Sequence, residues 1–490
     1  AGQLDRQVAM AAAGIPAGEA AKRVRGLGLA KLLQTGNAGG RRYFEPYHDR
    51  VRSAVLAHLD SAVRVAHHRR LAELLEARIG PELTPSSSAP MVPETRDGVA
   101  APVEYEPLAR HWYEAGDSSR AAYYATRAGD EAGRALAFDR AASWYRRAID
   151  LLSAIEPGDI DTGAAGRVRG LQVRLGRILT NAGRCREAAE AYLRAAEYAV
   201  GETTVELERL AMEQYLRGGH LDEGFTILRR VVGAVGLRLP KSRIGSLLSI
   251  LTQRIWLKLR GLGFRRRGED RVDSRELVKI DTAWSVSAGI AMADPIRGFA
   301  FSVRNLLLSL TAGEPYRLAR ALAVESIFLA NRHRKNGAKA ERVLALARGE
   351  AEHCGNPHAK GLVLMAAGMG HFYRGHWNSA VTELDKARAV FRYECSDITD
   401  SPISMLLSLW ALFHLGRLRD LTRRLPELMR QAEDRGDMQL TVNLVACLSH
   451  LLALAEDQPE WAREQVESYF GRWRSRAFYF QHWYTFIALT

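Results

Sequence analysis

Apolar residues recur every three or four positions through most of the chain, and glycines interrupt this pattern. The clearest example is the segment 171–199. Two apolar stripes at helical spacing follow each other there: Leu171, Leu175, Ile178 and Leu179, then Ala188, Ala189, Tyr192 and Ala196. Gly183 lies between the stripes and can adopt the left-handed conformation that ends a helix. The pattern therefore predicts two antiparallel helices, whose shared apolar face needs neighbouring helices to cover it.

Similar turns at similar distances predict further helix pairs. Gly183 and Gly218 are 35 residues apart. The later turns, near Gly337, Gly375, Gly416 and Asp457, follow at steps of 38, 41 and 41 residues. Each step is long enough for two helices and their loops. We therefore predict an all-α fold in which helix pairs stack into an α-solenoid.

The first 59 residues show a different order of elements. Helices are predicted at 3–12 and 16–26, followed by strands at 29–34 and 41–44 around the turn sequence TGNAGG. Two helices followed by a two-stranded wing are typical of a winged helix, a module that often binds DNA. The second helix contains Lys22, Arg23 and Arg25 but no base-reading pair of side chains, so we favour a packing role for this module.

The chain as a whole divides into five parts. They are a winged-helix-like module (1–59), a helix at 67–78 plus a Pro/Ser-rich linker (60–103), helical repeats (104–236), a basic amphipathic segment (237–272) and further helical repeats that stop inside a helix (273–490).

The basic segment interrupts the repeat pattern. Its residues 237–271 contain ten Lys or Arg and only two acids, Glu269 and Asp270. One side of the helix predicted there is apolar: Leu247, Leu248, Leu251, Ile255, Trp256 and Leu259. The candidate partner-binding residues are basic: Arg254, Lys258, Arg265, Arg266 and Arg267. Such a helix can lie on an anionic membrane or contact an acidic partner. We favour the simpler alternative, that its apolar side packs on the helical array.

Composition narrows the class of protein further. The net charge of +13 indicates a basic surface, which we interpret as solvated rather than bound to nucleic acid. The four cysteines are far apart and favour neither a disulfide framework nor a metal site, as expected in the cytoplasm. No apolar run is long enough to span a membrane, and no signal peptide is evident. The ends of the sequence suggest a fragment of a longer chain.

Three segments resemble the 34-residue tetratricopeptide repeat. The matching residues are Leu175, Gly176, Ala188, Tyr192 and Ala195 in 169–202; Gly129, Ala141, Tyr145 and Ala148 in 122–155; and Ala367, Gly368, Ala380, Leu384 and Ala387 in 361–394. The aromatic residue of the first helix and the closing proline of the family are absent from all three. The resemblance implies a tetratricopeptide-repeat-like solenoid that binds a protein or peptide.

A second resemblance covers residues 44–152. The run Phe44-Glu45-Pro46-Tyr47-His48-Asp49 and the helices after it resemble the region that follows the nucleotide-binding module in bacterial STAND-type signalling ATPases. Those chains carry a winged helix and then tetratricopeptide repeats, often beside a Ser/Thr kinase, cyclase or DNA-binding domain. The resemblance implies that this chain is the sensor and regulatory arm of such an ATPase or kinase, with ATP bound only in an upstream domain.

No catalytic, cofactor-binding or metal-binding residue is predicted in this chain. It contains no GxxxxGK[ST] loop to hold phosphates and no kinase HRD or DFG motif. His48 and Asp49 are adjacent on a predicted helix and do not face each other. Further histidines occur singly on predicted helices: His111, His371, His376, His414 and His482. We therefore favour a protein-interaction region over an enzyme; a DNA-binding transcription regulator that uses the winged helix and the basic segment is the alternative.

Overall fold

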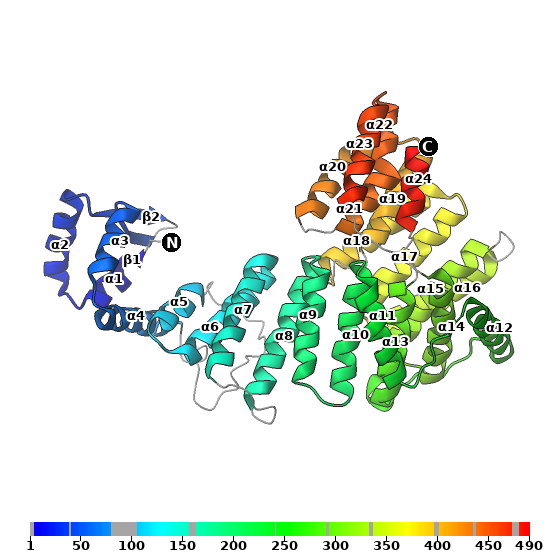
Figure 1. Ribbon diagram of the computed structural model, residues 1–490, viewed down its shortest axis with the longest axis horizontal. Coiled ribbons are helices and arrows are strands. Elements are labelled where there is room, and N and C mark those ends of the chain that lie inside the picture. The colour runs from blue at the N-terminus through cyan, green and yellow to red at the C-terminus, as the bar shows by residue number, and fades with distance from the viewer. Residues whose placement is uncertain are drawn as a thin grey trace. The chain divides into compact units, whose positions relative to one another are not determined.

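The computed structural model divides the chain into two compact units, Ala1–Leu175 and Gly176–Thr490 (Figure 1). It describes residues 4–38, 41–79, 105–155, 163–240, 242–290, 294–332, 337–395, 401–434, 438–472 and 480–490. Most of these residues are helical, so the predicted all-α class is confirmed. The Pro/Ser-rich linker predicted before residue 104 lies almost entirely outside the described residues.

The first unit begins with a small module of helices and a sheet. Its elements are β1 (Leu4–Asp5), α1 (Arg6–Ala13), α2 (Ala17–Leu29), β2 (Leu33–Ala38), β3 (Arg41–Pro46), α3 (Asp49–His58) and α4 (Ser61–Glu76). The sheet is antiparallel with strand order β1-β3-β2, and Phe44 of β3 lies between Leu4 and Thr35. Helix α1 packs against both the sheet and α4.

Several boundaries predicted for this module are wrong. Residues 4–5 form a third strand, because they pair with β3 instead of continuing α1. Leu29 is the last residue of α2, and the first strand of the predicted wing begins only at Leu33. Residues 35–38 of the predicted turn continue that strand. The helix predicted from residue 67 begins at Ser61, because the carboxylate of Asp60 accepts a hydrogen bond from the Ala62 N–H and caps it.

Helical repeats complete the first unit: α5 (Tyr105–Glu114), α6 (Ser118–Arg134), α7 (Phe138–Ile155) and α8 (Gly163–Asn181), which continues into the second unit. Consecutive helices α4, α5, α6 and α7 pack pairwise. The carboxylate of Asp130 in α6 accepts hydrogen bonds from the Tyr145 hydroxyl (2.7 Å) and the Arg174 guanidinium (2.7 Å). One acid thereby ties three successive helices together.

The second unit continues the array of helices. They are α9 (Cys185–Glu197), α10 (Glu202–Arg217), α11 (Leu221–Ala234), α12 (Arg243–Arg260), η2 (Glu269–Arg271), α13 (Ser274–Ile290), α14 (Pro295–Ala312), α15 (Pro315–Arg332), α16 (Gly337–Cys354), α17 (Pro357–Tyr373), α18 (Trp377–Tyr393), α19 (Ser401–His414), α20 (Leu418–Asp434), α21 (Met438–Leu444), η4 (Val445–Ser449), α22 (His450–Ala455), α23 (Pro459–Arg472) and α24 (Phe480–Leu489). The short element η4 is a π-helical turn inside the α21–α22 helix.

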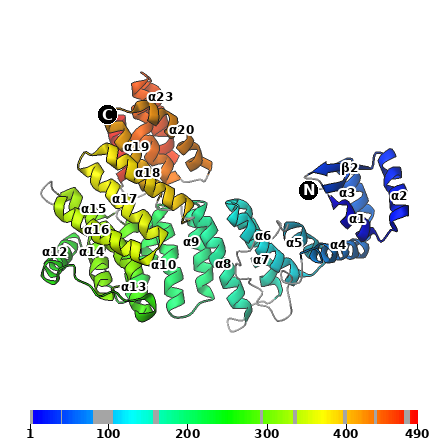
Figure 2. The same cartoon turned by 180° about the vertical axis from the view of Figure 1, so that it is seen from behind.

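The second unit is a stack of helix pairs. Neighbours in the chain pack as α10·α11, α13·α14, α15·α16 and α17·α18. The first helices of successive pairs also contact one another, in the order α10, α13, α15, α17 and α19, which we call the A row. Figures 1 and 2 show these helices side by side in the second unit. This arrangement is the predicted tetratricopeptide-repeat-like solenoid.

Close packing inside three of the helix pairs depends on a glycine that faces a large side chain. A Cβ added to Gly176 would lie 2.7 Å from the ring of Tyr192, and one added to Gly129 would lie 2.8 Å from the ring of Tyr145. Leu384 lies in the same way over Gly368. These are the glycine and large-residue positions on which the repeat resemblance was based. The missing Cβ lets the second helix approach the first closely.

Candidate partner-binding surface

The A row carries a buried network of charges where its first three helices meet. Asp281 of α13 accepts hydrogen bonds from Arg317 (2.7 Å) and Arg320 (2.6 Å) of α15. Arg209 of α10 bonds to Glu206 and Glu213 on its own helix and donates to the Ser285 hydroxyl of α13. Because each acid faces one or more arginines, this network ties helices together and leaves little charge to bind a partner.

The pKa values in this network follow from the pairing. Burial raises the pKa of Asp281, but Arg320 and Arg317 outweigh burial and hold it below the ordinary aspartate value. Burial lowers the pKa of Arg209, but Glu206 and Glu213 more than compensate and raise it. The carboxyl group of Asp281 therefore stays charged at neutral pH, which is the state in which the cluster of Asp281, Arg317 and Arg320 (the Asp281 cluster) holds α13 against α15.

A cluster of half-buried aromatic rings lies farther along the A row. Its members, which we call the aromatic cluster, are Phe372 of α17, Trp377 of α18, Trp410, Phe413 and His414 of α19, and Tyr484 of α24. The rings of Trp377 and His414 stack with centroids 4.9 Å apart, and Trp410 lies 5.7 Å from His414. The imidazole of His414 is exposed, whereas the other rings are partly covered.

The aromatic cluster has the chemistry of a protein-binding surface. Trp, Tyr and Arg side chains that are rigid and partly covered supply most of the binding energy in protein interfaces. Burial raises the pKa of Tyr484 to about 12, so its phenol is neutral at neutral pH. The pKa of His371, one residue before the cluster, is lowered by burial and then by Arg374. Tyr484 and His371 therefore present uncharged side chains at this surface.

His371, His376 and His414 occur singly in the sequence, and Trp377 and Trp410 belong to no motif there, so the sequence does not predict that these rings meet. The rings of His371 and His376 lie 6.0 Å apart, and His414 joins the aromatic cluster. His111 packs against His68, with 2.8 Å between their Nδ1 atoms, and burial together with His68 lowers its pKa to about 4. Across the described residues, no group of three or more His, Cys, Asp or Glu is placed to hold a metal ion.

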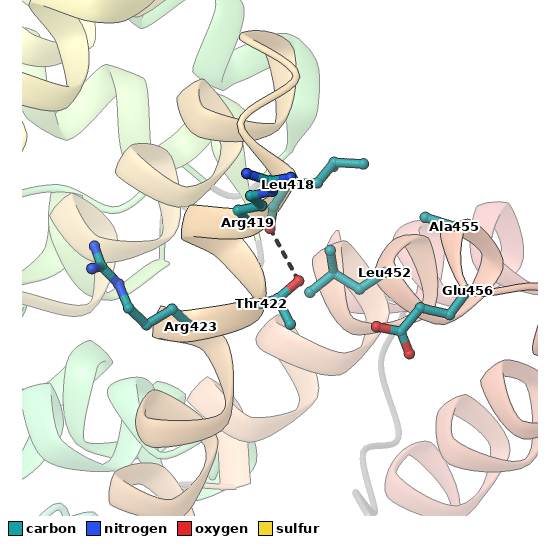
Figure 3. Close-up of a pocket in the computed structure, with 7 residues that line it drawn as sticks. All are labelled: Leu418, Arg419, Thr422, Arg423, Leu452, Ala455 and Glu456. Atoms are coloured by element: carbon teal, nitrogen blue, oxygen red, sulfur yellow. Dashed lines mark hydrogen bonds between the residues drawn. The ribbon is translucent and has the colours of Figure 1, made fainter.

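A hollow of about 450 Å³ lies between α20 and α22. It is lined by Leu418, Arg419, Thr422, Arg423, Leu452, Ala455 and Glu456. Figure 3 shows that the Thr422 side chain, whose hydroxyl donates to the Leu418 carbonyl, faces Leu452, whereas Arg423 points away. Its lining combines apolar side chains with Arg419, Arg423 and Glu456.

The structure separates the candidate basic residues into two kinds. Arg254 bonds to Glu325 of α15 (2.6 Å), and Arg266 makes a bidentate bond to the buried Glu350 of α16 (2.7 Å). Lys258, Arg265 and Arg267 are exposed. Two of the five candidates are therefore already engaged by acids of the same chain, and the other three remain accessible.

The favoured expectation for the apolar side of α12, that it packs on the array, is wrong. The six residues Leu247, Leu248, Leu251, Ile255, Trp256 and Leu259, which we call the apolar side of α12, are all more than half exposed. Helix α12 packs on α14 instead through its opposite side, where Ser246 and Leu257 are buried. No helix among the described residues has an apolar stretch long enough to cross a membrane.

Solved structures that match this chain share little sequence with it and have low TM-scores. A STAND protein with a tetratricopeptide repeat sensor from Pyrococcus horikoshii has 11% identity and a TM-score of 0.33, over 96% of this chain and 60% of that one. A Rap protein complexed with Competence and Sporulation Factor has 12% identity and a TM-score of 0.29, over 88% of this chain and 96% of that one. The APC/C hetero-tetramer Cut9-Hcn1 has 13% identity and a TM-score of 0.26, over 90% of this chain and 95% of that one.

No protein-family model matches the chain, and no curated protein matches its sequence. The chain spans 60% of the length of the STAND protein. All three TM-scores are low, so these likenesses carry no information on function.

Proposed function

We propose that this chain is a non-catalytic interaction region that binds a protein or peptide on its helical-repeat surface. The observation that supports it best is the aromatic cluster, which adjoins the A row and combines rigid rings with one exposed imidazole. Binding there would cover apolar ring surface without new ordering of the chain, since α17, α18 and α19 already hold the rings in place.

A selection of random peptides on the immobilised full chain tests this proposal. We expect selected peptides to bind with a Kd measurable by calorimetry, and the substitutions H414A and W377L to weaken binding at least about tenfold. The matched control is W461L on α23, because Trp461 is 46% exposed but lies outside the aromatic cluster. Peptides whose affinity is the same for H414A, W377L and the unaltered chain would place binding elsewhere and contradict the proposal.

We further propose that the chain is the regulatory arm of a signalling ATPase or Ser/Thr kinase. The sequence after the wing supports this, because Phe44 lies on β3 and Asp49 opens α3, in the order that the STAND resemblance implies. A partner would shift the activity of an upstream domain only by the difference between its affinities for the two states of the protein. The residues encoded before Ala1 test the proposal: a phosphate-binding GxxxxGK[ST] loop supports it, and an upstream region without an ATPase or kinase motif contradicts it.

A DNA-binding regulator is the second candidate. The first module supports it, because α1 and α2 lie in the chain between β1 and β2 of a sheet ordered β1-β3-β2, as in a winged helix. Lys22 and Arg25 are exposed on α2, while Arg23 pairs with Glu19 (2.6 Å). On this alternative, a gel-shift assay shows binding at low salt that is lost at moderate salt and reduced by K22Q/R25Q. Absence of any shift at low salt excludes it.

A further inference from the structure

Helix α12 exposes its apolar side, whereas an amphipathic helix at a protein surface usually buries that side against the core. Its apolar side faces away from the array, with Leu259 76% exposed, and Ile244 extends the same side at 79%. Figures 1 and 2 both show α12 beside α14, at the margin of the second unit. The helix has 18 residues, so the apolar side extends along roughly 27 Å. An exposed apolar stripe of this length is typical of an interaction surface.

Polar contacts hold α12 in this orientation. The guanidinium of Arg254 lies 2.6 Å from the buried carboxylate of Glu325 and 4.9 Å from the ring centroid of Phe299. Arg260 donates to the backbone carbonyl of Leu310 at 2.9 Å. Rotation that buried the apolar side would break these contacts and leave Glu325 buried without its cation, which is costly. The outward side is therefore fixed by the fold.

The charged residues in the segment that contains α12 are all basic. Residues 237–268 contain nine Lys or Arg and no Asp or Glu. Arg243 and Lys258 are exposed on α12 itself, and Arg265 and Arg267 are exposed just after it. Trp256 lies at the margin of the apolar residues, a position that suits an indole at a lipid–water boundary. An anionic surface with an apolar interior complements this combination of leucines, isoleucines and cations.

We propose that the apolar side of α12 binds the surface of an anionic lipid bilayer. The aliphatic side chains would enter the boundary between headgroups and acyl chains, and Lys258 and the arginines would contact the lipid phosphates. A second copy of the chain is a poorer occupant, because pairing α12 with α12 would bring two cationic segments together.

Sedimentation of the full chain with vesicles tests the proposal. We expect binding to vesicles of phosphatidylcholine mixed with phosphatidylglycerol, and much weaker binding to phosphatidylcholine alone. Substitution L248S/L251S/I255S removes apolar contacts, and K258Q/R265Q/R267Q removes cations while keeping the Arg266–Glu350 pair. Each of these two triple variants should have a partition coefficient on anionic vesicles at least about tenfold lower than that of the unaltered chain.

The control variant V200S/L454S changes two other exposed aliphatic side chains and should bind vesicles like the unaltered chain. Equal circular dichroism melting curves would show that the variants fold. The proposal is overturned if the unaltered chain does not bind anionic vesicles or if L248S/L251S/I255S binds them undiminished. It is likewise overturned if ultracentrifugation shows a dimer that this variant abolishes while vesicles are not bound, because the apolar side then serves a second copy.

Discussion

Replacing Asp281 by Asn should lower the free energy of unfolding of the second unit by about 3–5 kcal/mol. The side chain of Asp281 is 17% exposed, and those of Arg317 and Arg320 are 12% and 6% exposed. Asparagine keeps the size of the side chain but removes the charge that both guanidinium groups face. Arg317 retains Glu314 at 3.1 Å, whereas Arg320 loses its carboxylate partner. Urea unfolding followed by circular dichroism should show a lower midpoint.

A matched control separates this effect from the loss of any ion pair. Glu394 pairs with Lys360 at 3.1 Å, but both side chains are exposed, at 44% and 55%. The variant E394Q should therefore change the free energy of unfolding by less than about 1 kcal/mol. If D281N unfolds at the same urea concentration as E394Q, the Asp281 cluster does not hold the A row together.

The pH dependence of D281N has a definite sign. The folded pKa of Asp281 is below its unfolded value, so its stabilising effect is present above the unfolded pKa and is lost as the pH falls through the folded pKa. The difference in stability between the unaltered chain and D281N should thus be largest near neutral pH. It should shrink as the pH falls below about 3.9, the ordinary aspartate value.

Replacing Gly176 by Ala should also destabilise the chain, by about 1–3 kcal/mol. The added Cβ would lie 2.7 Å from the ring of Tyr192, inside a helix pair that depends on close approach. Gly170 on the same helix is the control, because nothing lies within 4 Å of its Cβ position. G170A should leave stability unchanged or raise it by up to about 1 kcal/mol, since alanine favours the helix.

A double-mutant cycle assigns the effect of G176A to the contact with Tyr192. In the Y192A background the ring is absent, so G176A should cost much less than in the unaltered chain. Thermal unfolding of the four proteins measures this coupling. Equal costs of G176A with and without the ring would mean that Gly176 is needed for another reason than close packing.

The sequence was enough to predict the helix pairs, because their signals are local. Gly183, Gly375 and Gly416 all adopt positive φ at predicted turns. Gly176 and Tyr192 are only 16 positions apart in the sequence. This pair belongs to the residues that match the tetratricopeptide repeat, and it lets α8 and α9 approach each other closely. Asp49 likewise begins α3 and lies in its first turn, where a carboxylate favours a helix.

What the sequence could not predict depends on contacts between distant segments. The apolar stripe of α12 was evident, but its outward direction depends on Arg254 meeting Glu325, 71 positions later. The aromatic cluster joins rings from Phe372 to Tyr484, and no spacing rule connects α17 with α24. The strand at residues 4–5 was missed because two residues carry no alternation pattern, and only pairing with β3 defines them.

Hydrogen–deuterium exchange of the full chain, with and without a peptide selected on it, tests the central claim most directly. The claim is that the repeat surface around the aromatic cluster receives the partner. We predict slower amide exchange on peptide binding in α17, in α19 and at the turn before Trp377, and no change in α2 or α12. Protection confined to α2 or α12, with α17 and α19 unchanged, would contradict it.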